Sequence, residues 1–496
     1  MTSERTRPEV EMAWLPLEHT YADELVGFGA PWEPTKAPAP ELVQLNTALA
    51  TELGLDPERL RSDDAVRVLA GAAAPTDAQP IAQVYAGHQF GNFNPQLGDG
   101  RAVLLGEIVD PAGHRYDLSL KGSGRTPFSR GGDGKAALGP ILREYLMGEA
   151  MHALGVPTTR ALAATTTGDL VRRDGMLPGS VLARVASSHL RVGTFQFFSS
   201  RGDVDRLRRL VDYTIARHDP DLSDAPNPPL ALLDAVIGRQ AALIAQWMHL
   251  GFIHGVMNTD NVTISGETID YGPCAFMDAH DPRTVFSSID HAGRYAYGNQ
   301  PTIGLWNMAR LAEALLPLID ADQDRAVGLA TEALDRYQGR YDDAWLAGMR
   351  RKLGLAGAHD GDHRLATEWL ALLEADHVDH TTAFRRLAEA ADGTLEHRVG
   401  VTALFDGSIT DWLDRWSARL TPDAATTMRS ANPIYVPRNH LVERALEAAV
   451  SDGDLAPFER LLDVVSDPYT PQPDSDEYEQ PAPDGFNRGY RTFCGT

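Results

Sequence analysis

The sequence is poor in cysteine and in basic residues, and it has no long apolar run. Of its 496 residues only Cys274 and Cys494 are cysteines, which excludes a disulfide framework and a four-cysteine zinc site. No apolar stretch reaches the roughly 20 residues that span a bilayer, and the charged N-terminus lacks a secretory pattern.

The charge is strongly negative: there are 45 Lys and Arg against 69 Asp and Glu, a net charge of −24. This charge disfavours general binding to nucleic acid or to an anionic membrane. We therefore expect a cytoplasmic protein with no nucleic-acid partner and no membrane partner. The oligomeric state is not indicated.

Several catalytic motifs are also absent. The sequence contains no HExxH, no GxSxG and no GxGxxG after a strand, so it does not support a metalloprotease, a serine hydrolase or a dehydrogenase. With 43% hydrophobic and 23% charged residues the composition is that of an ordinary globular protein.

The first half of the chain has a pattern typical of a sheet. Residues 1–80 look irregular apart from a short helix within 41–55. The runs 103–109 and 115–121 alternate apolar and polar residues around a DPAG turn, which predicts a β-hairpin ending at Lys121. A helix is expected over 138–154, followed by further strands, so that 84–190 forms a mixed sheet with one principal helix.

From residue 204 onward the periodicity is mainly helical. Residues 230–250 form a long, largely apolar segment that Gly251 should stop. Helical periodicity continues to about 465, and the Pro- and acid-rich tail from Ser466 should be extended or mobile. The expected fold class is therefore α+β, with a sheet-rich lobe, a larger helical lobe, and a ligand in the cleft between them.

The loop after the hairpin combines glycines with positive charge. Between Lys121 and Arg143 there are five cations and one acid, Asp133, and five glycines occur over 122–134. Glycines allow backbone N–H groups to approach a ligand closely, and the loop leads into a helix, which suits a polyphosphate. A solvated surface loop is the alternative, since the spacing matches neither a P-loop nor a dinucleotide fingerprint.

A second feature is HGVMNTDNVTISGETIDYG at 254–272. Asn261 and Asp270 are separated by an apolar-alternating strand and a turn at Gly266, and a hairpin would bring both oxygen-bearing side chains to one end. There they could hold a hard divalent cation on phosphate oxygens. Protein kinases use an Asn and the Asp of D-F-G in this way. The alternative is a pair of Asx-turn residues.

Other kinase features follow in the expected order, with one exception. Lys121 ends a strand of the first lobe, and Glu144 follows on the next helix, although alone it would be interpreted as an exposed helical carboxylate. The kinase base position, five residues before Asn261, is Val256, which cannot accept a proton. Asp260 is an available acid. The pattern predicts kinase-like nucleotide binding with abnormal transfer chemistry.

These motifs are long and distinctive. The stretches YAGHQFGNFNPQLGDGRAVLLGEI, LKGSGRTPFSRGGDGKAALGPILREYLMGEAM, ARVASSHLRVGTFQFF, HGVMNTDNVTISGETIDYGPCAFMD and NPIYVPRNHLVERAL resemble the selenoprotein O family, from about residue 84 to the C-terminus. The resemblance implies a protein-kinase-like bilobal fold and a protein adenylyltransferase that moves AMP, and by attribution UMP, to Ser, Thr or Tyr hydroxyls. It also implies ATP bound in an inverted orientation, with Mg²⁺ or Mn²⁺.

The resemblance assigns roles residue by residue. Asp260 would be the general base, Asn261 and Asp270 the metal ligands, and Glu144 the partner of Lys121. Arg184 and Arg191, otherwise ordinary surface arginines, would surround the inverted phosphates. The expected nucleotide contacts are Gly98, Gly100, Arg101, Lys121, Asp133, Gly134, Arg184, Arg191 and Asp270. The expected units are an N-terminal extension (1–83), a kinase-like first lobe (84–195), a second lobe with the catalytic loop (196–310), a helical extension (311–465) and a tail (466–496).

The resemblance also concerns the two cysteines. Cys494 lies where some family members carry selenocysteine, and the family is linked to redox control through this tail. The hypothesis is a Cys274–Cys494 disulfide that restrains the tail near the site; the alternative is two unpaired thiols in a reducing cytosol. Two other functions stay open from the residues: a conventional kinase that moves the γ-phosphate, and a nucleotide-binding scaffold without catalysis.

Overall fold

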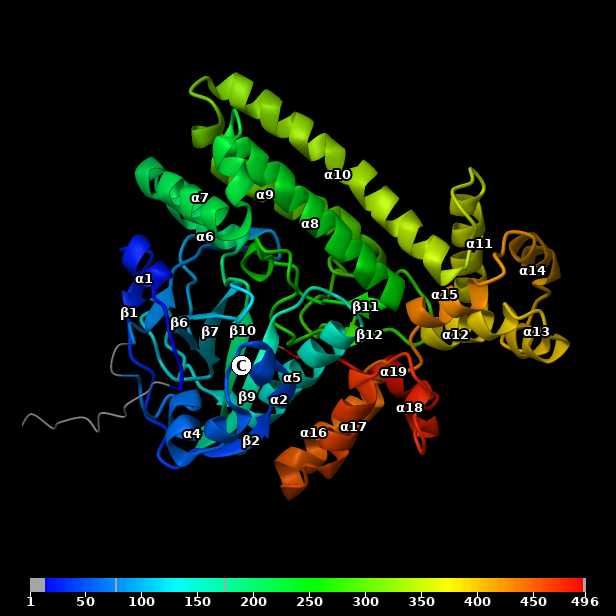
Figure 1. Ribbon diagram of the computed structural model, residues 1–496, viewed down its shortest axis with the longest axis horizontal. Coiled ribbons are helices and arrows are strands. Elements are labelled where there is room, and N and C mark those ends of the chain that lie inside the picture. Colours follow the sequence, from blue (N-terminus) through cyan, green and yellow to red (C-terminus); the bar gives the residue numbers. More distant parts are fainter. Residues whose placement is uncertain (1–13, 76–77, 174, 494–496) are drawn as a thin grey trace, which may run out of the picture.

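The computed structural model describes residues 14–75, 78–173 and 175–493, and it divides into a sheet-rich N-terminal part and a helical C-terminal part (Figure 1). The α+β class expected from the sequence is therefore observed. The strands are β1 (Gly29–Pro31), β2 (Glu41–Leu45), β3 (Ile81–Gln83), β4 (Gly87–Gln89), β5 (Asn92–Asn94), β6 (Ala102–Val109), β7 (Arg115–Lys121), β8 (Ala136–Ala137), β9 (Arg160–Arg172), β10 (Met176–Ala186), β11 (Phe252–Ile253) and β12 (Ala275–Phe276).

The main sheet has the order β1-β3-β6-β7-β10-β9-β2, with β8 paired to β10. The predicted hairpin is confirmed as β6 and β7, and Lys121 is the last residue of β7. The prediction of a mixed sheet is wrong for the described pairs, because every one of them is antiparallel. Successive strands are joined mostly by short turns, which favour antiparallel pairing.

The segment before residue 84 is more regular than predicted. Residues 41–45, expected within a short helix, form strand β2 and pair with β9. The helix begins only at α2, where Asn46 caps it by accepting from the backbone N–H of Leu49. The strands β1 and β3 extend the opposite edge of the sheet. Pairing at free sheet edges overrides the helical tendency of a five-residue run.

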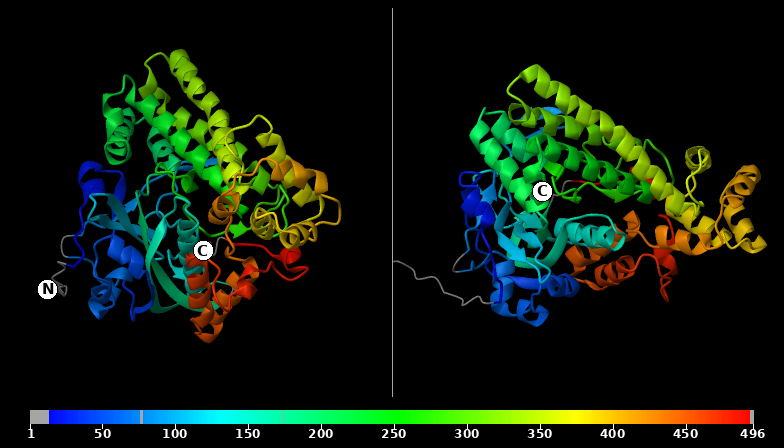
Figure 2. Two further views of the ribbon diagram at one scale, coloured as in Figure 1. Left: turned by 45° about the vertical axis from the view of Figure 1, so that its right-hand side comes forward. Right: turned by 45° about the horizontal axis from the view of Figure 1, so that its top comes forward.

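The helices cover both faces of the sheet and build the rest of the molecule (Figure 2). Their bounds are α1 (Thr20–Glu24), α2 (Thr47–Glu52), α3 (Pro57–Leu60), α4 (Asp63–Leu69), α5 (Leu138–Ala153), α6 (Val192–Ser199), α7 (Val204–His218), α8 (Pro228–Leu250), α9 (Gln300–Ile319), α10 (Gln323–Lys352), α11 (Asp362–Ala375), α12 (His380–Ala390), α13 (Leu395–Thr402), α14 (Thr410–Ser417), α15 (Ala424–Ala431), α16 (Asn439–Glu447), α17 (Ala456–Ser466), α18 (Asp476–Glu479) and α19 (Phe486–Gly489). Short helices of other types are η1 (Pro220–Asp224), η2 (Thr259–Asn261), η3 (Tyr297–Asn299) and the π-helical η4 (Ala448–Asp452).

Two predicted helices are confirmed with their end signals. Helix α5 packs against β9 and β10, and the chain leaves it at Gly155. Helix α8 ends at Gly251, whose φ of 69° is the left-handed conformation that glycine adopts at a helix end. By length and composition α8 could cross a membrane, but 56% of its apolar window is buried, against neighbours that include α9 and α10.

The helical part uses two packing environments. Helices α8, α9 and α10 share a core with α5 and one face of the sheet, whereas α11 to α15 surround a separate core that includes Trp369, Trp412 and Trp416. Helices α16 and α17 then return to pack beside α5 (Figure 1). Consequently the final segments of the chain lie close to the sheet-rich part.

Two predictions for loops are wrong. Residues 262–269 form no hairpin of their own, because Val262 and Ile264 exchange backbone hydrogen bonds with residues 190–192, and Thr268 with residues 157–159. The flanking segments offer pairing partners that the sequence does not reveal. The tail from Ser466 is not simply extended: up to residue 493 it contains α18 and α19 and packs on the body, with Tyr478 and Tyr490 buried.

Candidate active site

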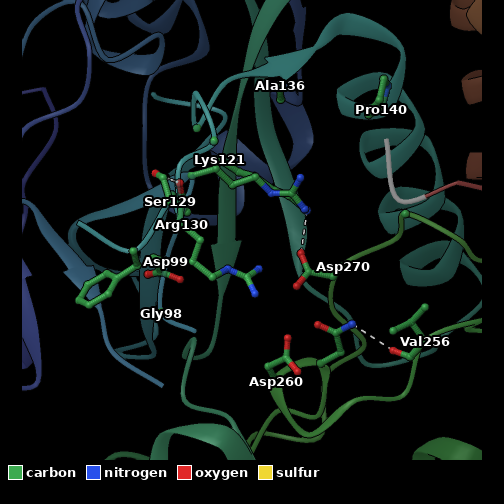
Figure 3. Close-up of a pocket in the computed structure, with 18 of the residues that line it drawn as sticks. Gly98, Asp99, Lys121, Ser129, Arg130, Ala136, Pro140, Val256, Asp260 and Asp270 are labelled. Carbon is green, nitrogen blue, oxygen red and sulfur yellow. Dashed lines mark hydrogen bonds and ion pairs between the residues drawn. The ribbon is translucent and has the colours of Figure 1, made fainter. Parts of the chain in front are cut away.

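A cavity of about 490 Å³ lies between the sheet and the segment that follows α8. Figure 3 shows Ser129 and Arg130 on one side of it, facing Asp260 and Asp270 on the other. The structure brings every predicted nucleotide, metal and base residue to its wall: Gly98, Gly100, Arg101, Lys121, Asp133, Gly134, Glu144, Arg184, Arg191, Asp260, Asn261 and Asp270.

A buried ionic network closes the inner end of the cavity. Lys121, at the end of β7, donates to Glu144 of α5 and to Asp270 Oδ1 at 2.7 Å. Arg184 of β10 bridges the same two carboxylates, at 3.2 Å from Glu144 Oε1 and 2.9 Å from Asp270 Oδ1. Arg191 lies 3.8 Å from Asp270 Oδ2. This arrangement concentrates cations where an anionic ligand can reach them.

These cations control the ionisation of Asp270. Burial alone would raise its pKa, but Lys121, Arg184 and Arg191 hold the pKa of Asp270 well below the usual range of a carboxyl. Asp270 also has a φ of +64°, a left-handed conformation that a non-glycine residue keeps only when its surroundings hold it. It is therefore a fixed, ionised carboxylate.

Asp260 has the opposite environment. It belongs to η2, and burial, reinforced by the negative charge of Asp270, raises its pKa to about 6, although Arg191 opposes the shift. Its Oδ1 atom is buried and has no hydrogen-bond partner among the residues that the structure describes. Arg191 donates to its backbone carbonyl at 2.9 Å, which fixes the main chain without engaging the carboxyl group. A carboxyl group with a pKa near neutrality suits proton transfer.

The donor set near Asp260 fits a hard divalent cation. Asn261 donates its amide nitrogen to the carbonyl of Val256 at 3.0 Å, so its amide oxygen is available as a ligand. Within the described part of the chain, Asp270 Oδ2 has only the 3.8 Å contact to Arg191. Within the described ranges no cluster of three or more His, Cys, Asp and Glu could hold a metal unaided. One carboxylate and one amide oxygen, completed by phosphate oxygens, is the kind of set that Mg²⁺ accepts.

The glycine-rich loops need their glycines. A Cβ on Gly98, which has a φ of +75°, would lie 2.5 Å from the ring of Phe128, and one on Gly134 would lie 2.2 Å from the carbonyl oxygen of Gly124. Asp133 is held by Arg173 at 2.9 and 3.1 Å, and these hydrogen bonds lower its pKa. The loop at Gly98 and the loop at 122–134 therefore lie in contact, and both line the cavity.

Not all five cations of the basic loop reach the cavity. Lys121, Arg130 and Lys135 line it. Arg125 is exposed and donates to the carbonyls of residues 131 and 132, and the buried Arg143 donates to the carbonyl of Cys274. The local charge read from the sequence therefore overstates the charge that faces a ligand, because Arg125 and Arg143 bond to other parts of the chain.

The hairpin β4–β5 was not predicted, and it hydrogen-bonds to the loop that contains Asp260. The backbone N–H of His88 donates to Thr259 Oγ1 at 2.7 Å, and that of Phe90 donates to Asn258 Oδ1 at 3.0 Å. A Cβ on Gly87 would lie 2.8 Å from Asp260 Oδ1. The only available signal was the density of Gly, Asn and Gln over 84–101.

Two further cavity residues were also missed. Asp99, within the QLGDGR motif, is buried in the cavity wall. The guanidinium carbon of Arg191 lies over the ring of Tyr85, 4.5 Å from the ring centroid. Asp99 could have been suspected from its flanking glycines, whereas nothing in the sequence pointed to Tyr85. The imidazole of the buried His254 is hydrogen-bonded to the carbonyl of Ile269 at 2.9 Å and does not line the cavity.

Cys274 is fully buried behind the Asp270 turn, and burial raises the pKa of its thiol to about 11. Cys494 lies outside the described residues. The disulfide between them stays a hypothesis.

Residues 14–466 match the family model described as "Protein adenylyltransferase SelO". The chain belongs to the SelO family. Proteins named "Protein nucleotidyltransferase YdiU" from Cereibacter sphaeroides (strain KD131) and Methylorubrum extorquens (strain PA1) are 60% and 57% identical to it. The alignments cover 97% and 98% of this chain and 99% and 100% of those relatives. A relative of the same name from Chromobacterium violaceum is 58% identical over 94% of this chain and 99% of its own. The match to SelO begins at residue 14, well before residue 84, where the sequence resemblance was first evident. The strands β1 to β3 within this earlier part belong to the main sheet.

Proposed function

We propose that this chain is a protein adenylyltransferase with a protein-kinase-like bilobal fold. It transfers AMP from ATP to a Ser, Thr or Tyr hydroxyl of a protein and releases pyrophosphate; UMP transfer from UTP would follow the same course. The observation that carries the proposal is the placement of Val256 and Asp260 on one cavity wall: the residue at the kinase base position is inert, and a carboxyl with a pKa near 6 lies beside it.

The geometry supports a direct displacement at the α-phosphorus. The acceptor hydroxyl gives its proton to Asp260 as its oxygen bonds to phosphorus, and the bond from that phosphorus to the bridging oxygen of pyrophosphate breaks. Lys121, Arg184 and Arg191 hold the negative charge of the leaving pyrophosphate. This assignment places the terminal phosphates at the cationic inner end and the α-phosphate toward Asp260.

Asn261 and Asp270 would hold the Mg²⁺ or Mn²⁺ ion. When bound, the ion would neutralise phosphate charge and align the triphosphate. Asp270 suits this role because its low pKa keeps it ionised at any physiological pH.

The test is the mass of a candidate acceptor protein after incubation with ATP, metal and this chain. We expect an adduct of one AMP, and label from α-³²P-ATP in the protein. A single added phosphate, with label only from γ-³²P-ATP, would instead show a conventional kinase. Nucleotide binding without any adduct would show a non-catalytic binder.

A further inference from the structure

The last described segment of the chain returns to the catalytic centre. After α19, Tyr490 and Thr492 are buried, with 8% and 3% of their surfaces exposed. Tyr490 joins a small apolar cluster that includes Phe286 and both strands of the β11–β12 pair. This segment, residues 490–492, is called the tail anchor below.

Tyr490 contacts helix α5 at the residue beside Glu144. Its hydroxyl donates to Glu443 Oε1 at 2.8 Å and accepts from the guanidinium of Arg143 at 3.2 Å. Arg143, which is 6% exposed, also donates to the carbonyl of Cys274 at 2.7 Å. A buried guanidinium is costly unless its N–H groups are satisfied, so Tyr490 and Glu443 help to fix Arg143 and hence α5.

Thr492 contacts the chain just beyond the Asp270 turn. Its side chain donates to the carbonyl of Pro273 at 2.7 Å. Its backbone N–H donates to Phe286 at 2.8 Å, and its carbonyl accepts from Ser288 at 2.9 Å. The carbonyls of residues 273 and 274 are therefore held by two different elements, the tail anchor and α5.

We propose that the tail anchor is a positioning element for the catalytic site. It holds α5 and the turn at Asp270 together in the arrangement in which Lys121 bonds to both Glu144 and Asp270. The left-handed backbone of Asp270 requires support from its surroundings, and the two bonds at 273 and 274 lie immediately after it. The activity test of this proposal rests on the proposed function.

The test compares Tyr490→Phe, Thr492→Val and the double variant with the wild type under reducing conditions. Each single variant removes hydroxyl hydrogen bonds and keeps the side-chain volume nearly constant. We expect a loss of about three- to ten-fold in the AMP-transfer rate at saturating ATP for each, and a larger loss for the double variant. Amide hydrogen exchange over residues 272–276 and in α5 should become faster, while the global unfolding temperature changes little.

The matched control deletes residues 494–496 and keeps the exposed Phe493 as the last residue, so that the carbonyl of Thr492 stays part of a peptide bond. It removes Cys494 and leaves the anchor intact, so it should keep the wild-type rate. Wild-type rates and exchange in the anchor variants would overturn the proposal, and so would an equal loss in the deletion or a gain of activity in the double variant. If the wild type transfers no AMP, the proposed function fails, and the exchange measurement still decides whether the anchor holds these segments.

Discussion

Asp260 and Asp270 show how burial and neighbours give one residue type two different states. Both carboxyl groups face the same cavity, and burial raises the pKa of each. Asp270 has Lys121 and Arg184 in direct contact, which reverses the effect, whereas the Oδ1 atom of Asp260 has no partner among the described residues. One carboxyl group therefore stays ionised and the other has a pKa raised to about 6, a difference of the kind that functional carboxylate pairs show.

The first prediction concerns Asp260. Asp260→Asn keeps the shape and removes the base, so the AMP-transfer rate should fall by about 10²–10⁴-fold while ATP affinity stays close to that of the wild type. Single-turnover transfer and equilibrium nucleotide binding measure the two quantities. Asp205→Asn, at an exposed carboxylate on α7, is the matched control and should change neither. Retention of more than about a tenth of the rate by Asp260→Asn would exclude general-base catalysis at this position.

The second prediction concerns Gly87. Its missing side chain makes room for Asp260, because a Cβ would lie 2.8 Å from Oδ1 and 2.8 Å from Leu97 Cδ1. Gly87→Ala should displace the carboxylate and lower the transfer rate by up to about 10²-fold, with ATP affinity unchanged. Gly400→Ala is the control, since a Cβ there would meet no described atom within 4 Å outside the backbone of its own helix. An active Gly87→Ala enzyme would show that the hairpin does not constrain the base.

Among single residues, the charged residues that line the cavity could be predicted from the sequence, whereas the residues that pack against them could not. Lys121, Glu144, Asp260 and Asp270 occur in motifs whose residue types and order carry chemical meaning. Gly87 makes room for Asp260 because it has no Cβ, and the ring of Tyr85 packs against the guanidinium of Arg191. Tyr85 and Arg191 are more than 100 residues apart in the sequence, and Gly87 and Asp260 are more than 170 apart, so no local pattern encodes either contact.

Among the elements, those with strong local signals were predicted and those that depend on a distant partner were not. The β6–β7 hairpin, α5 and α8 have clear periodicity and end signals, and all three are present. The strand β2 and the loop 262–269 are decided by which free backbone groups lie alongside them. Pairing partners are a tertiary property, and this accounts for the wrong predictions at β2 and at 262–269.

The third prediction concerns the tail and Cys274. Thr492 hydrogen-bonds to Pro273, so the described tail passes beside Cys274. Because the Cys274 thiol is buried and its pKa is raised to about 11, it should resist alkylation in the native protein at pH 7.5. The disulfide hypothesis predicts a 274–494 cross-link on oxidation, detected by non-reducing peptide mapping and absent from Cys494→Ser. Oxidised protein that yields no such peptide would exclude the hypothesis.

On the scale of the whole molecule, the cavity is supported from three directions. The sheet supplies Lys121 and Arg184, the segment after α8 supplies Asp260 and Asp270, and the end of the chain supports α5 through α16, α17 and the tail anchor. The sequence predicted the contributions of the sheet and of the segment after α8, as parts of two separate lobes. It could not indicate the third, since Arg143 and Tyr490 are 347 residues apart.

A buried cation lies where the separate helical core of α11 to α15 meets the main core. Lys352, the last residue of α10, is 4% exposed and lies 4.1 Å from the ring of Phe384 in α12. Burial lowers its pKa to about 7. Nearby, burial also lowers the pKa of His249 to about 3 and that of His280 to about 4, and it holds the pKa of His380 well below its usual value.

The fourth prediction is that Lys352 makes the fold less stable as the pH falls from about 10 to 7. The unfolded chain binds the lysine proton near its ordinary pKa of 10.5, whereas the folded protein binds it only near 7, so protonation in this interval favours unfolding. Lys352→Met removes the titration and keeps the buried volume. It should raise the free energy of unfolding by on the order of 2–4 kcal/mol at pH 7 and by much less at pH 10. Denaturant unfolding at pH 7, 8.5 and 10 measures the difference, with Lys36→Met, at an exposed lysine, as the control. An equal effect of Lys352→Met at all three pH values would show that packing, and not the lost charge, accounts for the change.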